Sequence, residues 1–272
     1  MSQIVRPLQV VHCSEEKSDE YKSELAIYCI KFLHNFEWGK FNHDDANLTY
    51  HLSEIIDFAL DSAISEIEAS ELLSRFVNFE RSRANGYAHR QGQLLAPFFQ
   101  HFPKETLDSV FLKDDDGGYW TSLRLVSEWS SEMQQETAIG KVPVNILIEW
   151  CEVSPSDRYL FAAQTCTLFK KTKLDDKENL VLSDNAKHIF ASAPDKKNIV
   201  EIFVSRFQPN GWSGSLADIL RKRLPLLDEL NLPGNSEIEQ VINDAKVYFN
   251  DRIDIEEKRE EDSERNRTGS FE

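Results

Sequence analysis

The sequence is short of turn-forming residues and of long apolar runs. It contains 10 Gly and 9 Pro in 272 residues, both below the average usage of about 7% and 5%. This scarcity, with 17 Phe, 5 Trp and 7 Tyr, favours helices over a turn-rich β-sandwich. No apolar run approaches the roughly 18 residues of a membrane span, and the N-terminus lacks the apolar core of a signal peptide. We therefore expect a cytoplasmic protein without a membrane segment.

Positive charge and paired cysteines are also scarce. The chain has 31 Lys and Arg against 47 Asp and Glu, a formal net charge of −16. Such a charge repels nucleic acid and anionic lipid, although a local basic patch can override it. No C-x-x-C pair is present, and the cysteines are expected to be reduced thiols, with no metal or cofactor bound. The four cysteines are Cys13, Cys29, Cys151 and Cys166.

Apolar residues recur at helical spacing in the first part of the chain. A first apolar stripe lies at 25–36, and similar stripes at 52–63 and 72–77 predict two more amphipathic helices. Ser70 is a candidate N-terminal cap, and Gly39 is expected to close the first helix. Further helices are predicted at 94–102, 104–112 and 119–136. The first stripe consists of Leu25, Tyr28, Cys29, Phe32, Leu33 and Phe36.

The second half contains a candidate internal repeat. VPVNILIEWCEVSPSDRYLFAAQTCTLF and LSDNAKHIFASAPDKKNIVEIFVSRF each suggest an apolar helix, a turn and a second helix. Pro155 and Pro194 stand at the two turns, each close to an Asp, as expected where helices begin. A period of about 40 residues with two helices per unit matches HEAT-type repeats. Ordinary helical hairpins remain an alternative.

These patterns predict an all-α fold in which helical hairpins stack as an irregular HEAT-like α-solenoid. We expect an N-terminal helical region at 1–141, a HEAT-like repeat region at 142–253 and a charged C-terminal tail at 254–272. A last helix near 236–255 precedes this tail. The pattern does not distinguish a full solenoid from a compact bundle, and it predicts no oligomeric state.

The segment GWSGS raises the question of a catalytic turn. A nucleophile elbow has the order G-x-S-x-G after a strand, but Gly214 follows Ser213 directly, and the preceding IVEIFVSRF has helical spacing. A phosphate-binding P-loop is excluded by the missing G-K-[ST]. Ser215 and Asp218 match a capping box. GWSGS is therefore predicted to be a tight corner before a helix that Pro225 kinks.

Residues beside this corner are the candidate partner-binding residues. Three consecutive cations stand out in an acidic chain, and a tryptophan precedes them. They would contact an acidic partner, or the acidic surface of the chain itself, and a solvated face is the alternative reading. No catalytic or metal-binding residue is predicted. The candidates are Trp212, Arg221, Lys222 and Arg223.

Two other functions stay open at this level. A metal-dependent phosphohydrolase of the HD type could use His12, His43, Asp44, His89 and Asp108, but FNHDDAN looks like a loop, whereas metal ligands must be held rigidly. A nucleic-acid interface would use the basic stretch FERSRANGYAHRQ, and the net charge disfavours it. Its candidates are Arg75, Arg81, Arg83, His89 and Arg90, with Phe79 and Tyr87 to stack on bases.

The run FVSRFQPNGWSGSLADILRKRLPLLDEL, followed by a charged helix and a terminal FE, resembles the C-terminal helical-repeat region of large bacterial multidomain proteins. Some of these belong to NTPase or effector systems connected with phage defence. The resemblance covers about residues 142–272 and includes no catalytic motif. It implies a non-enzymatic role in recognition or scaffolding through a protein partner. The chain would then be a partner subunit or a C-terminal module of a larger protein.

Overall fold

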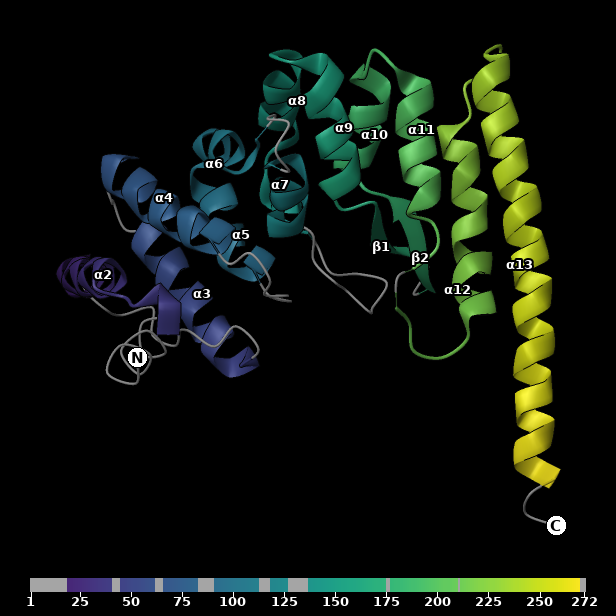
Figure 1. Cartoon of the computed structure of the whole chain (residues 1–272), viewed down its shortest axis with the longest axis horizontal. Coiled ribbons are helices and arrows are strands. Elements are labelled where there is room, and N and C mark those ends of the chain that lie inside the picture. The colour runs from purple at the N-terminus through teal and green to yellow at the C-terminus, as the bar shows by residue number, and fades with distance from the viewer. Residues whose placement is uncertain are drawn as a thin grey trace. The chain divides into compact units, whose positions relative to one another are not determined.

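A computed structural model describes residues 19–40, 45–61, 66–82, 91–112, 118–126, 137–174, 177–209 and 211–269. Among these residues helices dominate, and a two-stranded hairpin forms the sheet (Figure 1). The prediction of an all-α fold is confirmed at this level. The chain divides into two compact units. The N unit comprises residues 1–128 and 137–150, and the C unit comprises residues 129–136 and 151–272.

In the N unit, α5 is the central helix. It packs against α3, α6, α7 and η2, while α3 also contacts α2, and α4 contacts α6. The elements are α2 (Asp19–His34), η1 (Trp38–Lys40), α3 (Ala46–Asp61), α4 (Glu66–Ser82), α5 (Gln91–His101), α6 (Pro103–Val110), α7 (Gly118–Val126), η2 (Ala138–Lys141) and α8 (Val144–Glu152), whose last two residues belong to the C unit.

The first helices differ from the sequence prediction in three details. In α2 the buried face includes Leu25, Cys29 and Leu33, whereas Tyr28 is 68% exposed. This helix ends at His34, and Gly39 lies in η1 instead of closing it. Ser70 is no cap, because α4 already begins at Glu66, with acidic residues in its first turn.

The C unit consists of five helices, one hairpin and a 3-10 segment among the described residues. Three of the helices begin at a side-chain cap: Ser183 for α10, Asp195 for α11 and Ser215 for α12. Pro155 opens α9 at a position where its missing N–H costs nothing. The elements are α9 (Pro155–Thr165), β1 (Phe169–Leu174), β2 (Lys177–Leu182), α10 (Asp184–Ser192), α11 (Lys196–Ser205), α12 (Leu216–Arg223), η3 (Leu224–Leu230) and α13 (Ser236–Gly269).

The first predicted repeat ends at Phe169 and has a helix in its second part, but α9 ends at Thr165 and an antiparallel hairpin begins at Phe169. Phe169 pairs with Leu182 and Leu174 with Lys177. The ring of Phe169 lies 5.1 Å from that of Phe207, between centroids. The hairpin therefore contributes to the core at its open end.

The helices of the C unit pack side by side, each against at least one neighbour. The helix α11 packs between α9 and α13, α10 contacts both α9 and α11, and α12 packs against α13 (Figure 1). Phe203 and Phe207 are fully buried in this stack, and Phe207 also lies 6.0 Å from Phe249 of α13. Each hairpin thus buries its apolar face against its neighbours.

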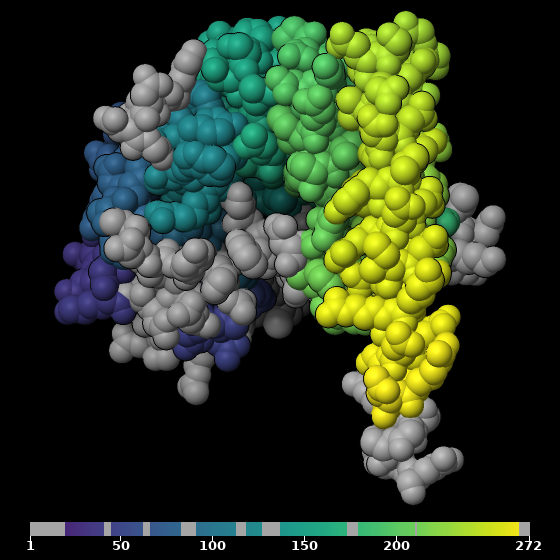
Figure 2. All heavy atoms as spheres, turned by 45° about the vertical axis from the view of Figure 1, so that its right-hand side comes forward, coloured from purple at the N-terminus to yellow at the C-terminus, as the bar shows by residue number. Residues whose placement is uncertain are grey.

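The last helix is longer than predicted, because it continues to Gly269. Its C-terminal part projects beyond the other helices of the C unit (Figures 1 and 2). Ion pairs within the helix support this part, such as Arg265 with Glu261 at 3.2 Å and with Asp262 at 3.7 Å. Among the described residues, no helix combines the length and apolar character needed to cross a membrane.

Candidate functional site

The GWSGS segment forms a tight corner in front of α12, as the sequence predicts. Gly214 has a φ of +80°, a conformation that glycine adopts without steric cost. The hydroxyl of Ser215 accepts a hydrogen bond from the N–H of Asp218 at 3.0 Å. After Arg223 the chain tightens into η3, with Pro225 near its start. The segment therefore serves as a helix start, and the element that precedes it most closely among the described residues is the helix α11.

Three of the four candidate contact residues lie at the surface beside this corner. The side chain of Trp212 is 41% exposed. Lys222 is exposed and forms no ion pair with any described residue. Arg221 is paired within the chain, with Asp218 at 2.7 Å and with Glu257 of α13. Of the two surface cations, Lys222 is the one available to a partner.

Arg223 lies in the interior and is not part of the exposed ridge. It is 6% exposed, and its Nη1 donates to the carbonyl of Phe207 at 2.6 Å. Its guanidinium stacks on the ring of Phe169 at 4.8 Å from the centroid. Burial, together with the positive charge of Arg206, lowers the pKa of Arg223 to about 10. At neutral pH the residue remains a cation.

Arg206 is a second, half-buried cation, which the sequence analysis does not single out. Its two terminal nitrogens donate to the carbonyls of Ala163 and Cys166, both at 2.6 Å. These carbonyls belong to the C-terminal end of α9, where cations are favourable. Among the described residues, no carboxylate forms an ion pair with Arg206 or Arg223. The pair of arginines therefore joins α9, α11 and α12 through backbone carbonyls.

The corner is also fixed from the side of α13. Glu260 accepts a hydrogen bond from the N–H of Leu216 at 3.1 Å, and Glu257 pairs with Arg221. Glu256, which directly precedes Glu257 in sequence, is 5% exposed. An acidic residue at the first turn of α12 is electrostatically favourable. These contacts join α12 to α13 and so fix the helix that carries Lys222 and begins just after Trp212.

The cysteines described by the structure are buried and unreactive. Burial raises the pKa of Cys29 and of Cys151 to about 12. Burial also raises the pKa of Cys166, against the opposing effect of Arg206. A thiol nucleophile requires a lowered pKa and access to solvent, so these three positions are structural.

Most residues of the HD-type alternative lie outside the described part of the chain, namely His12, His43, Asp44 and His89. Asp108 is described, and its carboxylate accepts a hydrogen bond from Nε1 of Trp150 at 2.8 Å. Within the described ranges, no group of three or more His, Cys, Asp or Glu is placed to hold a metal ion. This alternative gains no structural support there.

The residues of the nucleic-acid alternative are similarly divided. Arg83, Tyr87, His89 and Arg90 lie outside the described residues. Arg75 donates to the carbonyl of His34 at 2.5 Å. Arg81 donates to the carbonyl of Ser109 at 2.6 Å, and Phe79 is half-buried. The two described arginines therefore donate hydrogen bonds to backbone carbonyls of other segments of the chain.

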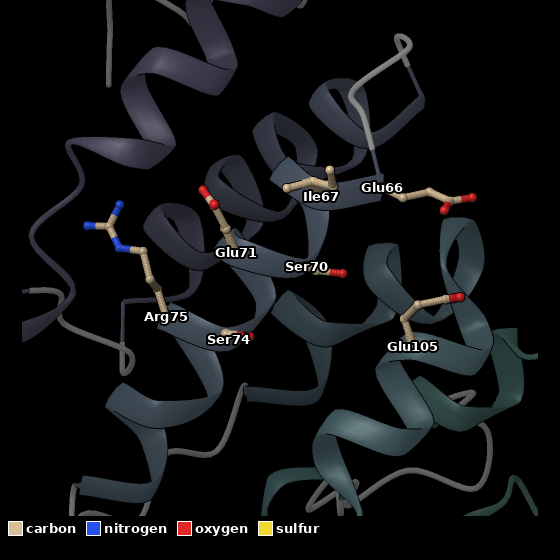
Figure 3. A pocket seen from close by; sticks show the side chains of 7 residues that line it. All are labelled: Glu66, Ile67, Ser70, Glu71, Ser74, Arg75 and Glu105. Carbon is tan, nitrogen blue, oxygen red and sulfur yellow. The ribbon is translucent and has the colours of Figure 1, made fainter.

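A surface hollow between α4 and α6 of the N unit was not anticipated from the sequence. Its volume is about 650 Å³. Figure 3 shows Ile67, Glu71 and Arg75 along one side of α4, with Ser70 and Ser74 nearer to α6, which contributes Glu105. The available signal was the i, i+4 spacing of Ile67, Glu71 and Arg75 on the polar face of α4.

Comparisons with known proteins identify no relative. No protein-family model, curated protein or solved structure matches the chain.

Proposed function

We propose that this chain is a non-enzymatic scaffold protein that binds a protein partner through its helical C unit. The hairpins would stack as an irregular HEAT-like solenoid in the bacterial cytoplasm. The proposal rests on the helix packing of the C unit, in which α11 lies between α9 and α13. Stacked helical hairpins present side chains from successive units along one surface, which suits an extended partner.

The candidate contact surface consists of Trp212 and Lys222. Trp212 is 41% exposed, and tryptophan is one of the residue types that dominate binding hot spots. Lys222, which forms no ion pair with a described residue, adds positive charge. The partner surface is expected to carry carboxylates. Arg221 would contribute only by exchanging its intramolecular pairs with Asp218 and Glu257.

The biological setting is proposed from the resemblance of residues 142–272 to repeat regions of bacterial multidomain proteins. In that setting the chain is a partner subunit, or a C-terminal module, of a phage-defence system, and catalysis belongs to another module. The GWSGS corner serves as a helix start, and we assign it no role in catalysis.

The test is affinity purification of the tagged protein from its native cytoplasm, with mass spectrometry of the eluate. Trp212→Ala and Lys222→Glu are compared with Trp120→Ala and Lys31→Glu, which alter an exposed tryptophan and an exposed lysine of the N unit. We expect a stoichiometric partner that the first two variants lose and the controls keep. Loss of a hot-spot tryptophan costs about 2 kcal/mol, roughly a thirtyfold loss of affinity.

Two results would contradict this proposal. Equal recovery of the partner by all four variants would show that this surface is not the binding site. A clean eluate that contains a transition metal near one equivalent would instead favour the HD-type alternative.

A further inference from the structure

The hollow between α4 and α6 carries unbalanced negative charge. Glu66, Glu71 and Glu105 line it and form no ion pair with other described residues. The lining includes one cation, Arg75, whose guanidinium donates to the carbonyl of His34.

Several acids of the C unit are paired within the chain. Lysine is the partner in pairs such as Lys170 with Asp184 at 2.6 Å and Lys187 with Glu229 at 2.9 Å. A third such pair joins Lys246 and Asp228 at 2.5 Å. Other exposed acids, such as Asp251 and Asp254 of α13, also form no ion pair with a described residue. The hollow is therefore distinguished by combining unpaired acids with an open, apolar surface.

Apolar surface is exposed in the same place. Ile67 is 73% exposed, and it follows Glu66 on the outer face of α4. Ser70 and Ser74 are small, so the space between α4 and α6 stays open (Figure 3). An open volume of about 650 Å³ can admit several side chains, and it lies within the range of ligand-binding pockets.

The arrangement of the acids indicates what kind of cation fits. The three carboxylates come from the start and middle of α4 and from α6, and no group of three or more described acids is placed to hold a metal ion. Separated carboxylates are better matched by several separated cations. An amphipathic helix with lysine or arginine along its edges provides such a set, and its apolar stripe can cover an exposed isoleucine.

We propose that this hollow binds a basic amphipathic helix of a partner protein. An apolar side chain of that helix packs on Ile67, and its cations lie beside Glu66, Glu71 and Glu105. This surface belongs to the N unit and is separate from the surface around Trp212, so the proposal does not depend on the function proposed above.

The test uses a fluorescein-labelled helical peptide with one leucine face and one lysine face, and fluorescence anisotropy measures its binding to the full chain. Two peptides serve as ligand controls: one carries glutamate in place of lysine, and the other carries serine in place of leucine. We expect binding of the first peptide only. Affinity should fall as salt is raised, because the screening length shortens from about 10 Å at 0.1 M.

Matched charge variants separate the hollow from the general acidity of the chain. Glu71→Lys with Glu105→Lys and Asp251→Lys with Asp254→Lys change the net charge equally, and the second pair lies on the exposed face of α13. Reversal in the hollow should weaken the peptide by about tenfold or more, because exposed attractions become repulsions. Reversal on α13 should change affinity by less than about twofold. Glu71→Gln with Glu105→Gln gives a milder loss without new cations.

The substitution Ile67→Asp tests whether the apolar contact contributes to peptide binding. This change adds negative charge, so attraction by charge alone would strengthen binding, whereas the proposed contact predicts weaker binding. The isoleucine is exposed, so circular dichroism should show an unchanged fold. Trp212→Ala should leave peptide binding unchanged, which keeps this test distinct from that of the proposed function.

Three outcomes would overturn the proposal. Equal weakening by the two charge reversals would show nonspecific attraction to an acidic chain. Unchanged or tighter binding by Ile67→Asp would remove the apolar contact. Self-association of the wild type in sedimentation, abolished by Ile67→Asp, would identify a second copy of this chain as the occupant.

Discussion

Replacement of Arg223 and of Arg206 should have different effects on the free energy of unfolding, although both side chains bond to backbone carbonyls. Burial and the charge of Arg206 lower the pKa of Arg223 to about 10. The difference from the ordinary guanidinium pKa corresponds to roughly 3 kcal/mol that opposes the charged form in the folded state. Arg223→Met removes this penalty and keeps most of the apolar stem.

The same substitution also removes favourable contacts. The carbonyl of Phe207 loses its donor at 2.6 Å, at a cost of about 1–3 kcal/mol. The contact with the ring of Phe169 is worth about 0.5–2 kcal/mol. Gains and losses nearly cancel, so the free energy of unfolding of Arg223→Met should lie within about 1 kcal/mol of the wild type, as found for other buried charges replaced by apolar residues.

Arg206→Met should behave differently, because Arg206 is only half-buried and caps α9 with two hydrogen bonds at 2.6 Å. We expect a loss of about 3 kcal/mol or more, since each of the two bonds from a charged donor contributes about 1.5–3 kcal/mol. Urea unfolding followed by circular dichroism measures both variants. A loss of more than about 3 kcal/mol for Arg223→Met would refute the reasoning.

The pH dependence gives the sign of the Arg223 effect independently. Because its folded pKa is depressed, the unfolded chain binds this proton more tightly, and the penalty is fully present below about pH 10. As the pH rises above this value, the penalty disappears. The wild type should therefore gain stability relative to Arg223→Met above pH 10, and an opposite trend would contradict the account.

Three further predictions concern the corner and the core of the C unit, and urea unfolding tests all of them. Ser215→Ala removes the acceptor of the Asp218 N–H and should cost about 1 kcal/mol, whereas Ser215→Asp should cost little; equal losses would contradict a capping role. Gly214→Ala forces a φ of +80° on a residue with a Cβ, so it should cost about 1–2 kcal/mol; no loss would show that the corner relaxes. Phe207→Ala empties a fully buried site and should cost about 3–5 kcal/mol; a loss below about 1 kcal/mol would place this ring outside the core.

Local rules predicted the helix starts well. Ser215 with Asp218, and Pro155 ahead of Asp157, mark beginnings that the structure confirms. These signals act within one turn, so they need no knowledge of the tertiary fold. The corner at Gly214 follows from the same local chemistry.

The prediction that Arg223 is a surface contact residue is wrong, although the sequence contains the information that places it in the interior. Residues two apart on a helix point in nearly opposite directions, so Arg221 and Arg223 cannot share one exposed ridge. The position of Arg223 continues the buried stripe of Leu216, Ile219 and Leu220. A guanidinium on that stripe has to find backbone carbonyls, as it does at Phe207.

The hairpin was missed because its two-residue loop contains neither Gly nor Asn, the residues that usually mark such turns. Phe169 to Leu174 and Lys177 to Leu182 flank Asp175-Asp176, which is the spacing of a two-residue hairpin loop. The apolar character of Phe169 was instead assigned to the preceding helix. The hollow at Ile67 depends on the pairing of α4 with α6, and this tertiary contact is not encoded in the spacing of either helix alone.

The scaffold role of the C unit is tested most directly by hydrogen–deuterium exchange on the chain with and without its captured partner. The account predicts slower exchange in residues 211–222 of the complex, around Trp212 and Lys222, and no such change when Trp212→Ala is mixed with the same partner. Unchanged exchange across this segment in a stoichiometric complex would contradict the proposed binding surface.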